Sequence, residues 1–164
     1  MIEPLNNLVF RNKLTAGDPG RIYQTAGLTG FFNPEEIAVA AELAEENLLK
    51  GMESGYEFLI AELDGQFAGY CCFGKIPCTL GSYDLYWIVV DPSRQKKGIG
   101  RSLISEAESV IKGKGGRRIF IETSSRPQYK PTRKFYTGAG FIREAVLADF
   151  YGTDDHKLVY SKYI

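Results

Sequence analysis

The chain has 164 residues, 44% of them hydrophobic and 24% charged, which is enough for the buried core of one soluble domain. Twenty Lys and Arg balance twenty Asp and Glu, and this zero net charge argues against a general nucleic-acid binder, which usually has a basic excess. The single histidine, His156, makes a Ser-His-Asp hydrolase or a zinc hydrolase a poor fit, so we expect no metal.

The sequence has no features of a secreted or membrane protein. Residues 1–13 have no uninterrupted apolar core behind a basic start, so we do not expect a signal peptide. No run approaches the roughly 18 apolar residues that a membrane span needs. The cysteines Cys71, Cys72 and Cys78 form no CxxC pair, and we expect them to be reduced. These features predict a cytoplasmic protein with no membrane partner.

The N-terminal third is predicted to hold a strand followed by two helices. Residues 8–14 favour a short strand, and residues 18–32 favour a weak helix. A stronger helix follows, because Asn33 and Glu36 have the spacing of a capping box, and Gly51 ends the run.

The middle of the chain is predicted to form a hairpin and then a βαβ unit. Asp64 and Gly65 are typical of a two-residue type I′ turn between two strands. Residues 83–90, YDLYWIVV, form an almost continuous apolar run that favours a central strand buried on both faces. Residues 99–111 have a helical apolar stripe, and residues 118–123 favour another buried strand, so these two strands should be parallel.

The C-terminal part is predicted to add a short helix and two strands. The helix covers residues 130–137, and the strands cover 142–148 and 156–164, which should be antiparallel. The fold class is therefore α/β with a mixed sheet, in a single domain over residues 1–164. Residues 149–155 form an acidic stretch between the last strands, where a solvated turn and an attraction for a cationic amine are both open.

Residues 94–102, RQKKGIGRS, place four cations and two glycines between the central strand and the next helix. A helix N-terminus favours an anion, and glycine lets the backbone approach a ligand closely, so the stretch favours a phosphate site over a solvated basic turn. A Walker A loop is excluded because Arg101 follows the last glycine where a lysine is needed. A Rossmann fingerprint is disfavoured because Leu103 stands where a small residue is required.

The stretch resembles the Q/R-x-x-G-x-G/A loop of the GNAT superfamily of acyl-CoA-dependent N-acetyltransferases, here Gln95 to Gly100. Residues 129–141, YKPTRKFYTGAGF, resemble the helix and FYxxxGF element of the same family. The resemblance covers roughly residues 56–164. It implies a mostly antiparallel central sheet flanked by helices, with one parallel pair of strands that splays apart to hold the pantetheine arm.

The resemblance also implies which residues act. Strand backbone and the glycine loop would hold acetyl-CoA, the acyl donor, through Ile88, Val89, Val90, Gln95, Lys96, Lys97, Gly98, Ile99, Gly100, Arg101, Ser102 and Tyr129. Tyr129 stands where members often have an asparagine, which leaves its contact open. Tyr136 aligns with the tyrosine that protonates the departing thiolate, although packing beside Phe135 would also explain it. Asp84 is the candidate general base, with Glu122 or ordered water as alternatives.

The sequence thus predicts an N-acetyltransferase that transfers an acetyl group from acetyl-CoA to a primary amine of a small molecule or peptide, by direct attack in a ternary complex. A non-catalytic acyl-CoA sensor on the same fold is the alternative, and a nucleotide-binding enzyme unrelated to CoA is a weaker one. The acceptor amine, the acyl-chain preference and the oligomeric state, a homodimer included, are left open.

Overall fold

A computed structural model describes residues 5–164. Residues 1–4, which begin the segment assessed above for a signal peptide, lie outside the described residues. The helices and strands are β1 (Leu8–Arg11), α1 (Asp18–Leu28), α2 (Pro34–Lys50), β2 (Glu57–Leu63), β3 (Gln66–Lys75), β4 (Ser82–Val90), α3 (Ile99–Gly113), β5 (Arg118–Ser124), α4 (Lys130–Gly138), β6 (Ile142–Gly152) and β7 (Asp155–Tyr163). Short 3₁₀ turns are η1 (Gly51–Ser54), η2 (Pro92–Arg94) and η3 (Pro127–Tyr129).

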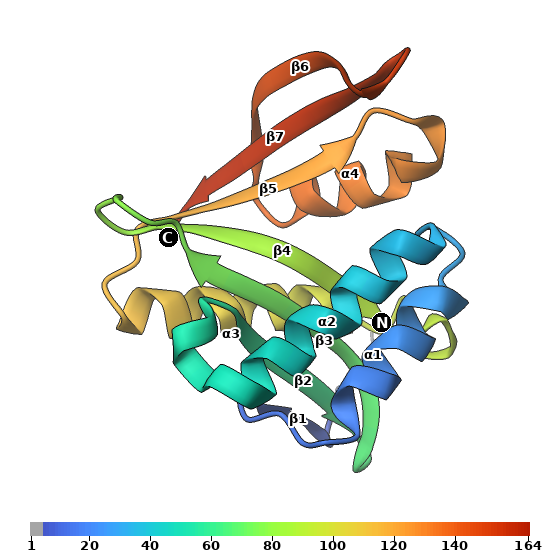
Figure 1. Cartoon of the computed structure of the whole chain (residues 1–164), viewed down its shortest axis with the longest axis vertical. Coiled ribbons are helices and arrows are strands. Elements are labelled where there is room, and N and C mark those ends of the chain that lie inside the picture. Colours follow the sequence, from blue (N-terminus) through green and yellow to red (C-terminus); the bar gives the residue numbers. More distant parts are fainter. Residues whose placement is uncertain (1–4) are drawn as a thin grey trace.

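The strands form one seven-stranded sheet in the order β1-β2-β3-β4-β5-β7-β6. Within residues 5–164, β4 and β5 are the one parallel pair, and the other neighbours are antiparallel. Figure 1 shows α1 and α2 on one face of the sheet and α3 behind it. The predicted mixed, mostly antiparallel α/β fold with one parallel pair is confirmed.

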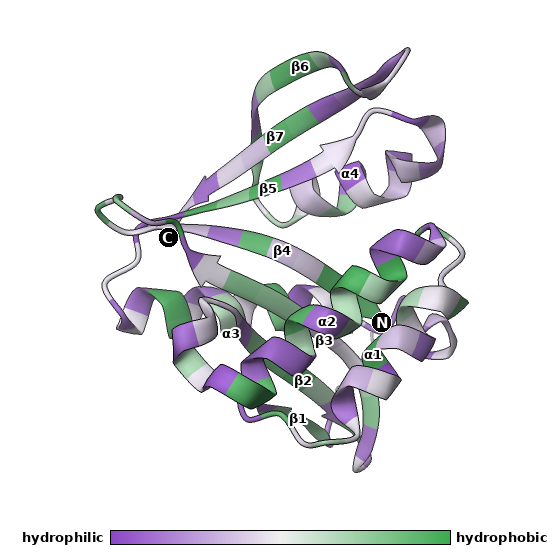
Figure 2. Ribbon diagram, in the orientation of Figure 1, coloured by the Kyte–Doolittle hydropathy of each residue, from purple (hydrophilic) through white to green (hydrophobic). Residues whose placement is uncertain are grey.

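Local sequence signals account for the boundaries of α2 and of the β2–β3 hairpin. Asn33 accepts from the Glu36 N–H, while the Glu36 carboxylate accepts from the Asn33 N–H, both at 2.8 Å. Figure 2 shows hydrophilic and hydrophobic residues alternating along α2, as expected for a helix with one buried face. Asp64 and Gly65 have φ angles of 55° and 73°, which is the left-handed pair that a type I′ turn requires.

A buried ion pair fixes the start of α1 to the edge of the sheet. The Arg11 guanidinium donates to both oxygens of Asp18 at 2.7 Å and to Glu62 of β2 at 2.8 Å. Burial opposes the ionisation of Asp18, but hydrogen bonds from Arg11 and from the Thr15 backbone outweigh it and lower the pKa of Asp18 to about 2. Helix α1, and with it the loop to α2, is therefore held in a defined position over the sheet.

Two hydrophobic clusters lie on the two faces of the sheet. The larger contains the α3 stripe, including Leu103 and Ile111, together with Tyr136 of α4. The smaller lies under α1 and α2 and includes Ile22 and Tyr70. Helices thus cover both faces of β3, and neighbouring strands on either side place β3 and β4 in the middle of the sheet.

Strand β4 is central, as predicted, but its second half is not buried on both faces. Tyr86 is 40% exposed, and Trp87 and Ile88 are half-buried. The hairpin at the C-terminus also differs from expectation, because β6 continues to Gly152 and the turn contains residues 153–154 alone. The acidic stretch is therefore mainly strand, and Asp155 is buried at the start of β7.

Candidate active site

Strands β4 and β5 pair at their first residues and then separate. The paired residues are Ser82 with Arg118, Tyr83 with Ile119 and Asp84 with Phe120. Figure 1 shows the two strands diverging beyond that point. A cleft of about 1130 Å³ opens between them. The edge of β4 from Leu85 to Val90 has no strand partner on this side within residues 5–164, so its backbone N–H and C=O groups are available to a ligand.

A β-bulge lies where the strands part. Cys72 of β3 pairs with Trp87 while Phe73 pairs with Leu85, so Tyr86 is the extra residue of β4. The bulge shifts the alternation of side chains along β4 by one residue, so that Leu85 and Trp87 point to opposite faces of the sheet. Leu85 belongs to the α3-side cluster, and Trp87 packs against the cluster under α1 and α2.

The loop after β4 leads to an uncapped helix N-terminus. Gly98 precedes α3 with a φ of 92°, and no side chain caps the helix. The first N–H groups of α3 have no carbonyl within the helix to donate to, so they can bind an anion. Lys96 and Lys97 are exposed beside this terminus. The residues present thus fit the pyrophosphate of acetyl-CoA.

Two residues of the basic loop have packing roles that the sequence did not reveal. A Cβ on Gly100 would lie 3.1 Å from the Phe135 ring, so this glycine lets α3 pack closely against α4. The Arg94 guanidinium donates to the Leu63 carbonyl at 3.2 Å and to Gln66 at 2.6 Å, which ties the loop to the β2–β3 hairpin.

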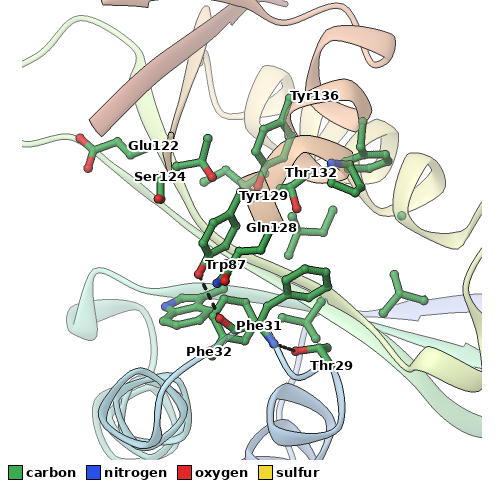
Figure 3. Close-up of a pocket in the computed structure, with 18 of the residues that line it drawn as sticks. Thr29, Phe31, Phe32, Trp87, Glu122, Ser124, Gln128, Tyr129, Thr132 and Tyr136 are labelled. Carbon is green, nitrogen blue, oxygen red and sulfur yellow. Dashed lines mark hydrogen bonds between the residues drawn. The ribbon is translucent and has the colours of Figure 1, made fainter. Parts of the chain in front are cut away.

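Tyr136 on α4 is buried, and its hydroxyl end points into the cleft (Figure 3). Its ring lies 5.8 Å from that of Phe135 and 6.2 Å from those of Phe141 and Tyr160, measured between centroids. Burial raises the pKa of Tyr136 well above its usual value, so the phenol stays protonated at neutral pH and can donate a hydrogen bond. Packing and a donor role are compatible here, because the ring is packed while the hydroxyl faces the cleft.

Asp84 lines the same cleft at the last paired position of β4. Burial raises its pKa, the nearby Glu122 raises it further, and Lys157 lowers it. Glu122 itself is paired with Lys157 at 2.7 Å. Asp84 has no cation within 4.0 Å among residues 5–164, so of these two carboxylates it is the one free to accept a proton from a ligand.

The loop between α1 and α2 supplies a wall of the cleft that sequence reasoning missed. The Phe32 ring lies 4.9 Å from the Trp87 ring, in an edge-to-face arrangement. The Tyr129 hydroxyl, from the opposite side of the cleft, donates to the Phe31 carbonyl at 3.1 Å (Figure 3). The hydroxyl of Tyr129 therefore bridges the two walls of the cleft. The only local signal was the Phe31-Phe32 pair before the α2 cap, and it does not say where the loop folds.

The structure gathers the predicted site residues in one place. All of them line the cleft except Lys97 and Ser102. Tyr151 and Asp155, from the acidic stretch, line it as well. No group of three His, Cys, Asp or Glu side chains suited to a metal occurs in the described part of the chain. Among the same residues no helix is both long and apolar enough to span a bilayer.

Comparison with known proteins decides the family. The protein-family model described as "Acetyltransferase (GNAT) family" matches residues 26–141. The chain belongs to the GNAT family of acetyltransferases. This GNAT protein is accordingly an acyltransferase that uses acetyl-CoA, as its sequence predicts. No curated protein matches its sequence.

Solved structures share its fold along nearly the whole chain. A Desulfovibrio desulfuricans protein assigned to the GNAT family is 45% identical, with a TM-score of 0.93 over 95% of this chain and 98% of that one. The aminoglycoside 6'-N-acetyltransferase of Enterococcus faecium is 20% identical, with a TM-score of 0.75 over 94% and 96%. The PaiA N-acetyltransferase of Thermoplasma acidophilum, solved with coenzyme A, is 22% identical, with a TM-score of 0.74 over 96% and 99%. The last two establish the shared fold alone.

The geometry predicts that Gly98→Val weakens acetyl-CoA binding. The branched side chain would block the uncapped N-terminus of α3 and would strain a backbone with a φ of 92°. We expect the dissociation constant, measured by calorimetry, to rise at least about tenfold, which is about 1.4 kcal/mol. Gly113→Ala, at the other end of α3 with open space around it, is the control and should bind normally. An unchanged constant in Gly98→Val would refute the assignment of the loop.

Proposed function

We propose that this protein acetylates a primary amine of a small molecule or peptide, by direct attack of the amine on acetyl-CoA in a ternary complex. The observation that carries the proposal is the single cleft that reaches from the uncapped N-terminus of α3 to Asp84 and Tyr136. A donor bound at one end and an amine at the other would meet beside the unpaired edge of β4, where proximity supplies much of the rate.

Each residue has a defined part in the proposed reaction. The amine nitrogen forms a bond to the thioester carbonyl carbon, and the carbon–sulfur bond breaks. A backbone N–H of β4 donates to the carbonyl oxygen as negative charge develops on it. Asp84 takes the proton that the amine loses, and the Tyr136 hydroxyl gives a proton to the departing sulfur. The products are an amide and free CoA thiol.

Release of CoA thiol with a panel of primary amines tests the proposal directly, and Tyr136→Phe tests the part of the hydroxyl. We expect kcat to fall at least about tenfold while the dissociation constant of acetyl-CoA stays the same, because the ring packing is kept and the proton donor is lost. Tyr160→Phe is the matched control, since this tyrosine packs against Tyr136 but does not line the cleft. Equal turnover in Tyr136→Phe would remove the residue from the mechanism, and CoA binding without any thiol release would favour a sensor.

The pH profile of kcat/KM distinguishes Asp84 from Glu122 as the base. Activity is lost as pH falls through the pKa of the base, since the protonated carboxyl cannot accept a proton. Asp84→Asn should remove this acid limb and lower kcat/KM at least about tenfold. Glu122→Gln should instead move the limb to lower pH, because it removes a negative neighbour that raises the pKa of Asp84. Loss of the limb in Glu122→Gln, with its retention in Asp84→Asn, would reverse the assignment.

We also propose that the protein is cytoplasmic and that it forms a homodimer. Cys71, Cys72 and Cys78 are free thiols, which supports a reducing cytoplasmic compartment.

Strand β6 is an edge strand with every residue exposed, including Ile142 at 60% and Val146 at 50%, which supports association of two copies through this edge. Light scattering on the purified protein should give twice the 18.3 kDa chain mass. A single-chain mass at high protein concentration would exclude the homodimer.

A further inference from the structure

One half of the cleft has an aromatic lining. We call it the acceptor half, the part bounded by the α1–α2 loop, the bulged section of β4, β5, the η3 turn and the β6–β7 hairpin. Its aromatic residues include Phe31, Phe32, Trp87, Tyr129 and Tyr151, and Tyr86 and Phe120 line the cleft as well. Phe32 meets Trp87 edge to face, and the ring of Phe31 lies 6.0 Å from that of Tyr129. Such surfaces bind flat or apolar groups and stabilise ammonium ions over their faces.

The acceptor half also carries four carboxylates. Two of them are neutralised by cations, Glu122 by Lys157 at 2.7 Å and Asp155 by Arg126 at 2.9 Å. Burial, Glu122 and Asp155 together raise the pKa of Tyr151 to about 12, which agrees with their gathering around this hydroxyl. The ion pairs account for these two carboxylates within the folded chain.

The other two carboxylates, Glu36 and Asp84, have no cation within 4.0 Å in residues 5–164. Glu36 accepts a hydrogen bond from the Asn33 N–H at the start of α2, and this residue lines the cleft. The charge at this end is therefore negative, whereas Lys96 and Arg101 line the end that faces the phosphates of the donor. A cation is attracted to the acceptor half, and a carboxylate is repelled from it.

Several of the hydroxyl and amide groups on this half are already committed to the protein. The Thr29 hydroxyl donates to the Ala26 carbonyl at 2.7 Å. The Ser124 hydroxyl is hydrogen-bonded to Asp155, and the Asn33 side-chain oxygen caps α2. A polyhydroxylated body would lay polar groups against aromatic rings that cannot pair them fully, which disfavours it relative to an apolar body.

We propose that the acceptor is a primary amine carried on an aromatic or extended apolar body that has no carboxylate. The inference rests on the proposed acetyl transfer and specifies its substrate class. The ammonium form is drawn between Glu36 and Asp84, the body packs against the aromatic lining, and Asp84 then removes the proton that must leave before attack. Amino acids are rejected by charge, and aminosugars are disfavoured because their hydroxyl groups would lie against the aromatic lining.

A matched panel of acceptors tests the class. The probes are 2-phenylethylamine, phenylalanine, which adds a carboxylate to the same body, and glucosamine, which replaces the ring by a polyhydroxylated one. With saturating acetyl-CoA we expect kcat/KM for 2-phenylethylamine to exceed that of each other probe at least about tenfold, since phenylalanine brings a carboxylate toward like charge and glucosamine loses the apolar contact with the aromatic lining. Equal or faster acetylation of phenylalanine or glucosamine would overturn the proposal.

The variant Glu36→Gln isolates the charge. Glutamine also completes a capping box, so α2 should fold normally. In Glu36→Gln the ratio of kcat/KM for 2-phenylethylamine to kcat/KM for phenylalanine should fall at least about threefold, because one of the two unpaired carboxylates is gone. Glu35→Gln, on the neighbouring exposed residue outside the cleft, is the control and should keep the full preference. The same ratio in Glu36→Gln as in the unsubstituted enzyme would overturn the electrostatic basis of the proposal.

Equilibrium binding separates this inference from the proposed function. Trp87 is the single tryptophan of the chain and lines the acceptor half, so its fluorescence reports amine binding without any chemistry. Tighter binding of 2-phenylethylamine than of phenylalanine, without thiol release, would support the amine class and refute acetyl transfer. Thiol release with acceptors of another class, and no preference in the Trp87 titration, would refute the amine class and leave acetyl transfer standing.

Discussion

The separation of β4 from β5 after three paired residues is the constraint on which the site depends. If the parallel pairing of β4 and β5 continued, their backbone groups would hydrogen-bond to each other and no cleft would open between them. Here the bulge at Tyr86 turns β4 away, and helices cover both faces of the part of the sheet that remains paired. The cost is a row of unpaired backbone groups in the middle of a domain, which a folded protein tolerates where a ligand or solvent satisfies them.

The two proposed ends of the cleft offer different physical means of binding. The donor end offers backbone: the edge of β4 and the N–H groups at the start of α3. Binding through backbone groups needs no particular side chain, only the absence of one that would block the ligand, and Gly98 has no side chain. The acceptor end is built from side chains of segments far apart in the sequence. Its charge is negative where the proposed donor end is positive, so electrostatics would sort the two proposed substrates along one cavity.

Much of the fold, and the position of the glycine loop proposed to bind the donor, could be predicted from the sequence because their signals are local. The Asn33 and Glu36 capping box, the Asp64-Gly65 turn and the glycine loop each act within a few residues, and the structure has the predicted elements in the predicted order. The packing of Gly100 against Phe135 was not predictable, since it joins two helices that local patterns treat separately. The full burial expected for β4 was wrong in its second half, because an apolar run does not distinguish a core strand from the wall of a ligand cleft.

By itself, the amino-acid sequence determined the kind of protein, a mixed α/β GNAT acetyltransferase with a glycine loop between a central strand and a helix. It could do so because backbone geometry and helix termini are encoded by short spacings. Tertiary structure alone decided which side chains meet across the cleft. The hydrogen bond from Tyr129 to Phe31 spans 98 residues of chain. Asp84 lacks a paired cation because the nearby Lys157 pairs with Glu122 instead. Contacts of that range are set by the packing of whole elements, and no local pattern records them.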